Sequence, residues 1–288
     1  MSDPNPRRPI ANAEQADYWN SAAGQSWVDL HEVLDRQLEP VVDLLLEIAQ
    51  LQPGEHVIEV GCGTGATLLR LADRVGPGGQ VLGIDISALM LEAAARRTAG
   101  LSQVRLLNAD AQTHAFEPVV ADRVVSRFGV MFFNDPIAAF RNLAGALRPG
   151  GRLAFVCWAP IEENPWFAIP RAIGVRHLGA PEPTPSHAPG PFAFADAGYV
   201  EEILAAAGLG KIRIERRALV LPGEATASRQ LAAALAIGPL ARMMRERAPD
   251  AATRAAIVAD LEHELRPFES LDGIRVPAKV FAVRAIRP

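Results

Sequence analysis

The chain has 288 residues, of which 49% are hydrophobic, and its formal net charge is −4. This length and composition suit one large α/β domain, and the lack of a Lys- and Arg-rich run argues against a nucleic-acid substrate. No apolar run is long enough to cross a bilayer, the first residues lack the apolar core of a signal peptide, and the two cysteines have no metal-ligand spacing. We therefore expect a cytoplasmic protein without integral membrane contact or a metal site, acting on a small molecule.

The segment from Ala13 to Gln50 predicts two helices, the second with an apolar stripe. Three large aromatic residues, Tyr18, Trp19 and Trp27, lie near the junction of these helices. Two interpretations stay open, because such rings are either buried in the core or cover a pocket.

Residues His56 to Gly65, HVIEVGCGTG, predict a buried strand that enters a tight turn. Gly61, Gly63 and Gly65 remove the Cβ atoms where a ligand must approach the backbone. The next helix starts near Thr64, so its amino-terminal N–H groups point into the turn. Gly61, Gly63 and Ala66 also satisfy the G-x-G-x-x-(G/A) pattern of dinucleotide-binding folds, so a nicotinamide cofactor is also compatible with the turn.

Acidic residues follow the next two predicted strands. Residues 80–84 form a strand that ends in Asp85, whose carboxylate is suited to accept hydrogen bonds from two ribose hydroxyls. Asp85 is alternatively a helix-capping acid, and Met90 in the next helix is either core filling or an adenine contact. A third strand, residues 104–107, leads to Asp110.

A fourth strand begins at Asp122 and carries Ser126 and Arg127 at its carboxyl end, where ligands bind in doubly wound sheets. Arg127 is alternatively a structural ion-pair partner. A helix that begins at Asp135 is followed by the turn LRPGG, residues 147–151, and by a fifth strand, residues 152–158.

Residues 159–191 are rich in proline and predict an insertion after strand five. Such an insertion overhangs the carboxyl edge of the sheet, so we expect it to supply walls of an acceptor pocket. Ordinary packing of these rings is the alternative. The candidate pocket residues from all segments are Tyr18, Trp27, Phe132, Trp158, Trp166 and Phe167, with Trp19 and Phe133 beside them.

The spacing E-x-G-x-G-x-G, from Glu59 to Gly65, resembles motif I of the class I S-adenosylmethionine (SAM)-dependent methyltransferases. The segments DISALML and LRPGG are also similar to that superfamily, and the cofactor motifs resemble its ubiquinone and menaquinone biosynthesis type. The resemblance covers about residues 52–223 and the last strand, residues 277–286. It implies an α/β fold with a doubly wound, seven-stranded Rossmann-like methyltransferase sheet and helical insertions after strands five and six.

The resemblance also implies SAM as cofactor and S-adenosylhomocysteine (SAH) as product. Asp110 would then accept a hydrogen bond from the adenine amino group, and the end of strand four would lie beside the methionine moiety. The cofactor-binding residues expected are Glu59, Gly61, Gly63, Gly65, Asp85, Ile86, Met90, Asp110, Ala111, Ser126, Arg127 and Phe128.

We expect six segments along the chain. They are an amino-terminal helical lid (residues 1–50), a SAM-binding core (51–158), an acceptor-site lid (159–195), a core helix with strand six (196–222), a helical insertion (223–275) and the terminal strand (276–288).

The expected activity is methyl transfer from SAM to a small, partly apolar acceptor, mainly by proximity and alignment. If the acceptor atom carries a proton, His31, His177 and His187 are candidate bases, and no catalytic residue is assigned. A noncatalytic SAM-binding module stays open. An NAD(P)-dependent oxidoreductase would need a pair such as Tyr-x-x-x-Lys, which neither tyrosine supplies. The partner expected is the small-molecule acceptor, and a homo-oligomer stays open.

Overall fold

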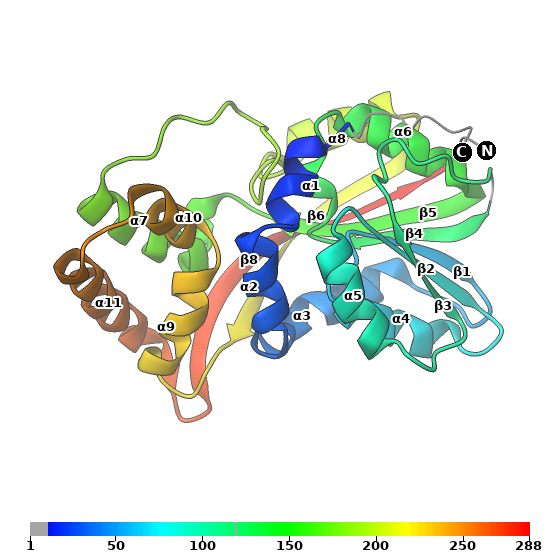
Figure 1. Ribbon diagram of the computed structural model, residues 1–288. Helices are drawn as coiled ribbons and strands as arrows, with labels where there is room; N and C mark the ends of the chain where they lie inside the picture. The colour runs from blue at the N-terminus through cyan, green and yellow to red at the C-terminus, as the bar shows by residue number, and fades with distance from the viewer. Residues whose placement is uncertain (1–10, 119) are drawn as a thin grey trace, which may run out of the picture.

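The computed structural model describes residues 11–118 and 120–288, apart from the side chain of Arg229. A central sheet has the strand order β3-β2-β1-β4-β5-β8-β6, with the short strand β7 paired to β8 (Figure 1). The first five strands are parallel, and β8 runs antiparallel to both of its neighbours. The strands are β1 (His56–Val60), β2 (Gln80–Asp85), β3 (Val104–Asn108), β4 (Ala121–Arg127), β5 (Leu147–Trp158), β6 (Gly210–Pro222), β7 (Glu269–Ser270) and β8 (Gly273–Ile286).

The doubly wound fold predicted from the sequence is confirmed. The sheet grows outward from β1 in both directions, since Ile58 pairs with Leu82 of β2 on one side and with Val124 of β4 on the other. Such a reversal opens a crevice at the carboxyl ends of the strands. Within the described residues, the main path has seven strands, the number expected, and β7 adds a short eighth strand that was not predicted.

Helices cover both faces of the sheet (Figure 1). α3 (His31–Ala49), α4 (Ala66–Val75) and α5 (Ala88–Arg97) lie on one face, and α6 (Pro136–Ala146) and α8 (Ala197–Ala206) lie on the other. The first residues of α5 and α6 follow directly from the sequence, because the side chains of Ser87 and Asp135 cap these two helices. A short 3-10 turn, η1 (Val130–Phe132), links β4 to the loop before α6.

Residues 13–50 form three helices, where the sequence predicted two. α1 (Ala13–Trp19) and α2 (Ala22–Asp29) precede α3. The break has a local cause: the side chain of Ser21 accepts a hydrogen bond from the Ala23 N–H and starts a new helix at Ala22.

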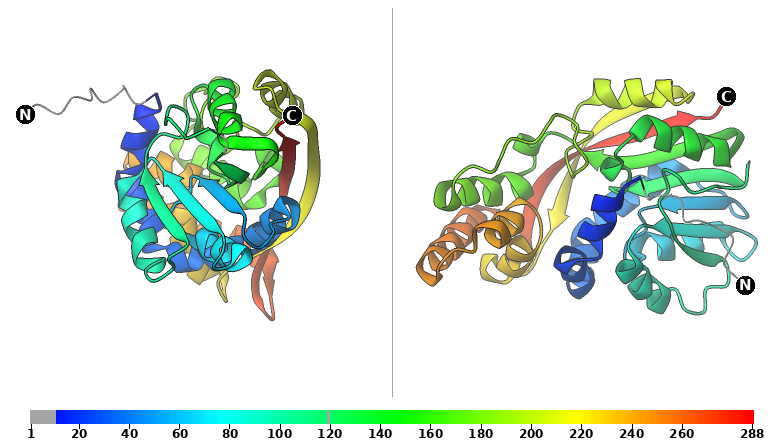
Figure 2. Two further views of the ribbon diagram at one scale, coloured as in Figure 1. Left: turned by 90° about the vertical axis from the view of Figure 1, so that its right-hand side faces the viewer. Right: turned by 45° about the horizontal axis from the view of Figure 1, so that its top comes forward.

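The segments after β5 and β6 form a helical unit beside the sheet, and we call it the cap. It consists of α7 (Pro165–Leu178), α9 (Ala227–Ala236), α10 (Pro239–Arg247) and α11 (Ala251–Leu265), with η2 (Ile161–Glu163) and η3 (Arg266–Phe268) at its ends. Figure 2 shows β6 and β8 leaving the sheet and running toward the cap.

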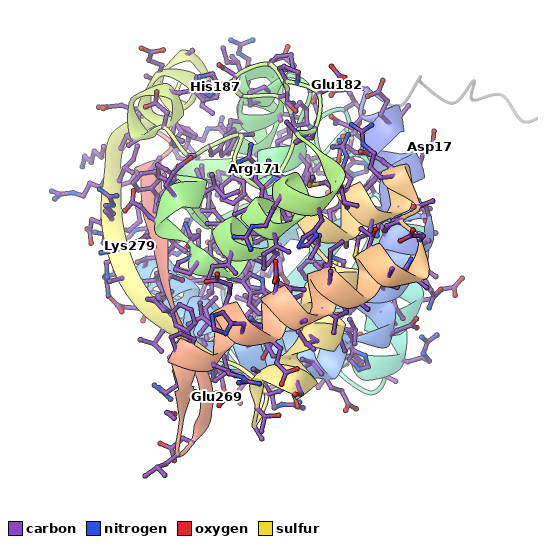
Figure 3. The ribbon with its side chains drawn as sticks, turned by 90° about the vertical axis from the view of Figure 1, so that its left-hand side faces the viewer. Asp17, Arg171, Glu182, His187, Glu269 and Lys279 are labelled. Carbon is purple, nitrogen blue, oxygen red and sulfur yellow. The ribbon has the colours of Figure 1, made fainter. Side chains whose placement is uncertain are left out.

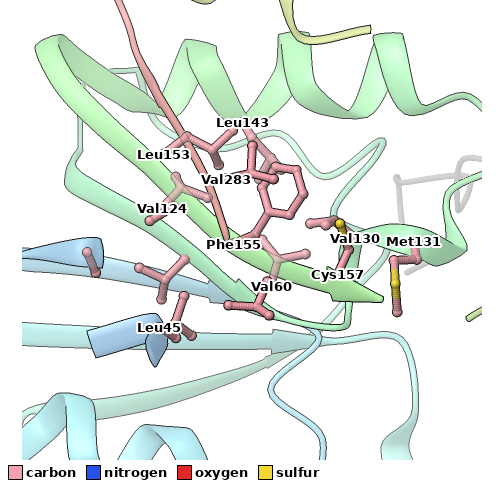
Figure 4. Packing of buried hydrophobic residues seen from close by; sticks show 14 of the residues in the cluster. Leu45, Val60, Val124, Val130, Met131, Leu143, Leu153, Phe155, Cys157 and Val283 are labelled. Carbon is pink, nitrogen blue, oxygen red and sulfur yellow. The ribbon is translucent and has the colours of Figure 1, made fainter. Parts of the chain in front are cut away.

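The apolar side chains form two separate clusters. The larger one packs around the sheet, and Figure 4 shows Val124, Leu153 and Phe155 in it. The smaller one fills the cap and includes Leu240 and Leu261. Within the described part of the chain, no helix combines the length and the apolar character needed to cross a membrane.

Candidate functional site

A cavity of about 900 Å³ lies at the carboxyl edge of the sheet, where the strand order reverses. Its floor includes the ends of β1, β2 and β4. Its other walls come from α1, α2, the first turns of α3, the cap and residues 181–193. The volume falls within the range of small-molecule sites, roughly 300–1,000 Å³.

The glycine turn after β1 has the backbone that its sequence predicted. Gly61, Gly63 and Gly65 have φ angles of 68°, 53° and 87°, a region that favours glycine. A Cβ at Gly61 would lie 2.7 Å from the Cα of Gly129, so the turn touches the loop after β4. Gly61 and Gly63 line the cavity, but Gly65 does not. A Cβ at Gly65 would lie 3.2 Å from the Cβ of Ala94, so this glycine instead permits close packing of α5.

Asp85 fixes the glycine turn to the end of β2. Its Oδ2 atom accepts the Gly63 N–H at 2.8 Å, and its Oδ1 atom accepts the Ser87 N–H at 2.8 Å. Burial raises the pKa of Asp85, and the backbone hydrogen bonds from Ser87, Gly63 and Ile86 oppose this shift. Asp85, Ile86 and Met90 all line the cavity. A carboxylate has about four acceptor positions, so Asp85 can still accept a hydrogen bond from a ligand.

Asp110 also lines the cavity, but it has a protein partner that was not predicted. Its carboxylate accepts the backbone N–H of Asn12 at 3.1 Å and the side-chain amide of Asn12 at 2.8 Å. It also accepts the Gln112 N–H at 2.9 Å. Asn12, the residue just before α1, is therefore held against the carboxylate to which the resemblance assigns the adenine amino group.

Glu59 and Arg127 are two ionisable residues that interact near the ends of β1 and β4, where Glu59 is buried and Arg127 is partly buried. Burial raises the pKa of Glu59 to about 8, although the charge of Arg127 and the hydroxyl of Thr67 lower it. Arg127 donates from Nε to the Thr67 hydroxyl at 3.2 Å, and burial lowers its pKa against the attraction of Glu59 and Asp35. Arg127 lines the cavity and Glu59 does not.

Ser126 lies outside the cavity lining and joins β4 to β1. Its hydroxyl donates to the Val60 carbonyl at 2.8 Å and accepts the Gly129 N–H at 3.0 Å. The prediction that Ser126 lines the cofactor site is therefore replaced by a supporting role: Ser126 holds Gly129 against the glycine turn.

Aromatic rings form one wall of the cavity. Phe128 stacks on Trp158 with centroids 4.2 Å apart, and Trp158 meets the edge of Phe167 at 5.1 Å. Phe167 in turn meets Phe192 at 5.2 Å. Phe128 has a φ of 64°, which is unusual for a bulky residue and indicates a strained turn held by its surroundings. We call Phe128, Trp158, Phe167 and Phe192 the aromatic wall.

A second aromatic group reaches the cavity from the amino-terminal helices. Trp19 contacts Trp27 at 6.1 Å and Phe132 at 5.3 Å, both edge to face. Tyr18 of α1 and Trp166 of α7 also line the cavity. Every pocket residue expected from the sequence therefore lines this one cavity. The alternative of core packing also applies in part, because Trp158 and Phe167 are buried.

Two of the three candidate histidines reach the cavity. The Nδ1 atom of His31 lies 2.8 Å from the Val28 carbonyl, and that of His187 lies 3.2 Å from the Ala193 carbonyl. Because a carbonyl can only accept, each Nδ1 carries a proton, which leaves Nε2 as the free acceptor of the neutral ring. His177 lies outside the lining and bonds to Asp260 at 2.8 Å, so its candidacy as a base fails on position.

The cap contributes charged residues to the outer part of the cavity. Figure 3 shows the molecule from the side of the cap, with Arg171 on α7 and with Glu182 and His187 in the segment that follows. On α10, Arg242 pairs with Glu246 at 2.7 Å. Within the described residues, we find no group of three or more His, Cys, Asp or Glu residues arranged to hold a metal ion.

Several lining residues were not predicted, among them Asn12, Gln37 and Gly129. Asn12 meets Asp110 across 98 residues of sequence, a pairing that no local pattern reveals. Gln37 lies within the apolar stripe of α3 and lines the cavity. For Gly129 a signal existed, since it follows strand four by two residues at the edge where ligands bind.

Comparison with known proteins agrees with this geometry. A family model described as "Methyltransferase domain" matches residues 57–151. Nocamycin O-methyltransferase of Saccharothrix syringae is 35% identical over 184 residues, which cover 60% of this chain and 66% of that protein. Demethylmenaquinone methyltransferase of Staphylococcus aureus (strain JH9) is 37% identical over 101 residues, which cover 35% of this chain and 42% of that protein. The matches therefore span 66% or less of these curated relatives.

A solved structure supports the fold over a longer stretch. Phosphoethanolamine N-methyltransferase 2 of Haemonchus contortus, in complex with S-adenosyl-L-methionine, superposes with a TM-score of 0.54 at 17% identity. The superposition covers 100% of this chain and 62% of that chain. At this identity the likeness concerns the fold.

Proposed function

The chain belongs to the class I SAM-dependent methyltransferase superfamily, and from this premise we propose that it transfers the SAM methyl group to a small, partly apolar acceptor. One observation carries most of this proposal: a single cavity joins the glycine turn and Asp85 to the aromatic wall. A polar end and an apolar end in one chamber suit two different ligands that meet. A module that only bound SAM would have no use for the second compartment.

The residues around the turn fit SAM. Gly63 lines the cavity opposite Met90, and a Cβ at Gly63 would lie 3.7 Å from the Met90 sulfur, in the space between them. Asp85 and Asp110 supply two carboxylates for the ribose hydroxyls and the adenine amino group. Arg127 supplies a positive charge for the methionine carboxylate.

When bound, SAM supplies a methyl group that its positive sulfur already activates for in-line displacement. The protein therefore has to hold donor and acceptor in line and exclude water, and such alignment can contribute about 7–11 kcal/mol. The aromatic wall and the amino-terminal rings provide the water-poor surroundings. If the acceptor atom carries a proton, His31 and His187 each offer a free Nε2 atom toward which it can move.

Calorimetry with SAM, SAH and NAD tests the cofactor assignment. A ligand that binds only the folded state raises its stability by mass action, so we expect SAM and SAH, but not NAD, to raise the melting temperature. Tight binding of NAD without binding of SAM would overturn the proposal.

The acceptor assignment is tested with Trp166→Ala, because Trp166 lines the cavity and lies on α7, apart from the glycine turn. With methyl-labelled SAM and a library of small aromatic acceptors, we expect the wild type to form SAH and the variant to show a raised acceptor KM or a lowered kcat. SAH affinity should stay unchanged. Full turnover by the variant would remove the apolar-pocket interpretation.

A further inference from the structure

Gln37 is a buried polar residue whose side-chain oxygen has no partner. It lies in the second turn of α3, it is one of the residues that line the cavity, and it is only 2% exposed. Its Oε1 atom has no hydrogen-bond partner among the described residues. A buried amide without a partner costs roughly 1–3 kcal/mol, so such a group in the wall of a ligand cavity calls for a ligand atom.

The direction of Gln37 on the helix separates it from the cofactor end of the cavity. Asp35 faces the glycine turn, because it pairs with Arg97, which donates to the Thr64 carbonyl. Successive helical residues are rotated by about 100°, so Gln37 points about 160° away from Asp35. The neighbouring Arg36 pairs with Glu224, just beyond the end of β6, which places that side of α3 toward the cap.

The role inferred for Gln37 rests on the proposed methyltransferase function. We propose that Gln37 determines acceptor specificity, and that the acceptor is an apolar, ring-containing molecule with a hydroxyl group that bonds to the Gln37 carboxamide. The aromatic wall receives the ring. The free Oε1 atom requires a hydrogen-bond donor, and a hydroxyl can bond to either end of a carboxamide because it both donates and accepts.

The first test asks whether the amide of Gln37 is free in the absence of ligand. Replacing an unsatisfied buried polar group with an apolar one of similar shape is neutral or stabilising. We therefore expect Gln37→Leu to keep or raise the melting temperature of the ligand-free protein. The control is Gln230→Leu, because Gln230 is also buried but its Oε1 atom accepts the Glu224 N–H at 2.7 Å, and only its Nε2 atom is without a partner among the described residues. The control should lower the melting temperature.

The second test measures recognition of a hydroxyl with two probes of similar shape, 2-naphthol and 2-methylnaphthalene. Tryptophan fluorescence in the presence of SAH gives the affinity of each probe. We expect the wild type to bind 2-naphthol about 5- to 10-fold more tightly, the size of one net hydrogen bond. Gln37→Leu should lose this preference and keep its affinity for SAH.

Several outcomes would overturn the inference. The first is a loss of stability in Gln37→Leu equal to that in Gln230→Leu. The second is a wild type without a preference for the hydroxyl probe, either because both probes bind equally or because neither binds. The third is a preference for the hydroxyl probe that survives in Gln37→Leu. Failure of the wild type to bind SAH at all would instead contradict the proposed methyltransferase function, so the two failures are distinguishable.

Discussion

Asp85 supports both the protein and the proposed ligand, because it accepts the Gly63 and Ser87 N–H groups and also lines the cavity. We expect Asp85→Asn to weaken SAH binding by about 1.5–3 kcal/mol, the range for hydrogen bonds to a charged group. Titration calorimetry measures this effect. Asp122→Asn is the control, because Asp122 accepts the His56 N–H at the start of β1, the opposite edge of the sheet. Equal SAH affinity in the wild type and Asp85→Asn would move the ribose site elsewhere.

Glu59 predicts a pH dependence of stability. Its pKa is raised from 4.5 to about 8 by burial, so the folded state keeps a proton that the unfolded state releases above pH 4.5. The contribution of Glu59 is therefore fully present below pH 4.5 and declines as the pH rises to about 8, by at most about 1.4 kcal/mol per pH unit.

Glu59→Gln should remove this decline, because glutamine does not titrate. Urea denaturation of ligand-free protein between pH 5 and pH 9 measures the free energy of unfolding of both proteins. Relative to Glu59→Gln, the wild type should become less stable as the pH rises to about 8. Above that pH, the difference in the free energy of unfolding should stay constant. If the free energies of unfolding of the two proteins changed in parallel with pH, Glu59 would be ionised in the folded protein.

At the scale of elements, long-range hydrogen bonds hold both ends of α1 beside the cavity. Asn12 ties the start of α1 to Asp110, and the Ser87 hydroxyl donates to the carbonyl of Trp19 at the end of α1. We expect Asn12→Ala to speed SAH dissociation, because the helix then opens more often. Stopped-flow fluorescence measures the rate, and hydrogen exchange in α1 should rise with it.

The control for Asn12→Ala is Gln25→Ala, whose amide bonds to Asp29 within α2 at the surface. It should leave the dissociation rate unchanged. Slower dissociation in Asn12→Ala would contradict a closing role for α1 and would indicate that Asn12 competes with the ligand for Asp110.

The same elements show how far the sequence could be interpreted. The strands β1 and β4 were predictable because each carries adjacent branched apolar residues, Val57-Ile58 and Val124-Val125, as strands buried on both faces do. The turn glycines and Asp85 were predictable because they follow such strands directly. The partner of Asp110 was not, because Asn12 meets it only once the chain has folded.

The surroundings of Gln37 and His177 could not be predicted from their residue type. Gln37 looks like an interruption of an apolar stripe, and only its position on the folded helix shows that it faces a cavity. His177 looks like a free histidine, and only the packing of α11 against α7 supplies Asp260. Residue type alone does not distinguish these two cases.

At the scale of the whole molecule, the sheet and the cap have separate hydrophobic clusters. Leu261 is fully buried in the cap, and its replacement by Ala typically costs about 2–5 kcal/mol. We expect Leu261→Ala to increase hydrogen exchange in α7 and α9–α11 and to reduce acceptor turnover. SAH affinity should stay within about twofold of the wild type, as for distant, independent sites.

Leu143→Ala is the comparison, because Leu143 on α6 is buried to a similar degree in the larger cluster. It should destabilise the sheet and leave exchange in the cap unchanged. A loss of SAH affinity in Leu261→Ala, equal to the loss of acceptor turnover, would show that the two clusters act as one.

The long ribbon of β6 and β8 has an evolutionary consequence. Both strands continue past the sheet, and the cap helices α9–α11 are inserted between them. A lineage can therefore lengthen, shorten or replace the helices at the end of this ribbon without altering β1 or the glycine turn that follows it. New acceptors could be acquired by changing one end of the molecule, while the chemistry at the other end is inherited intact.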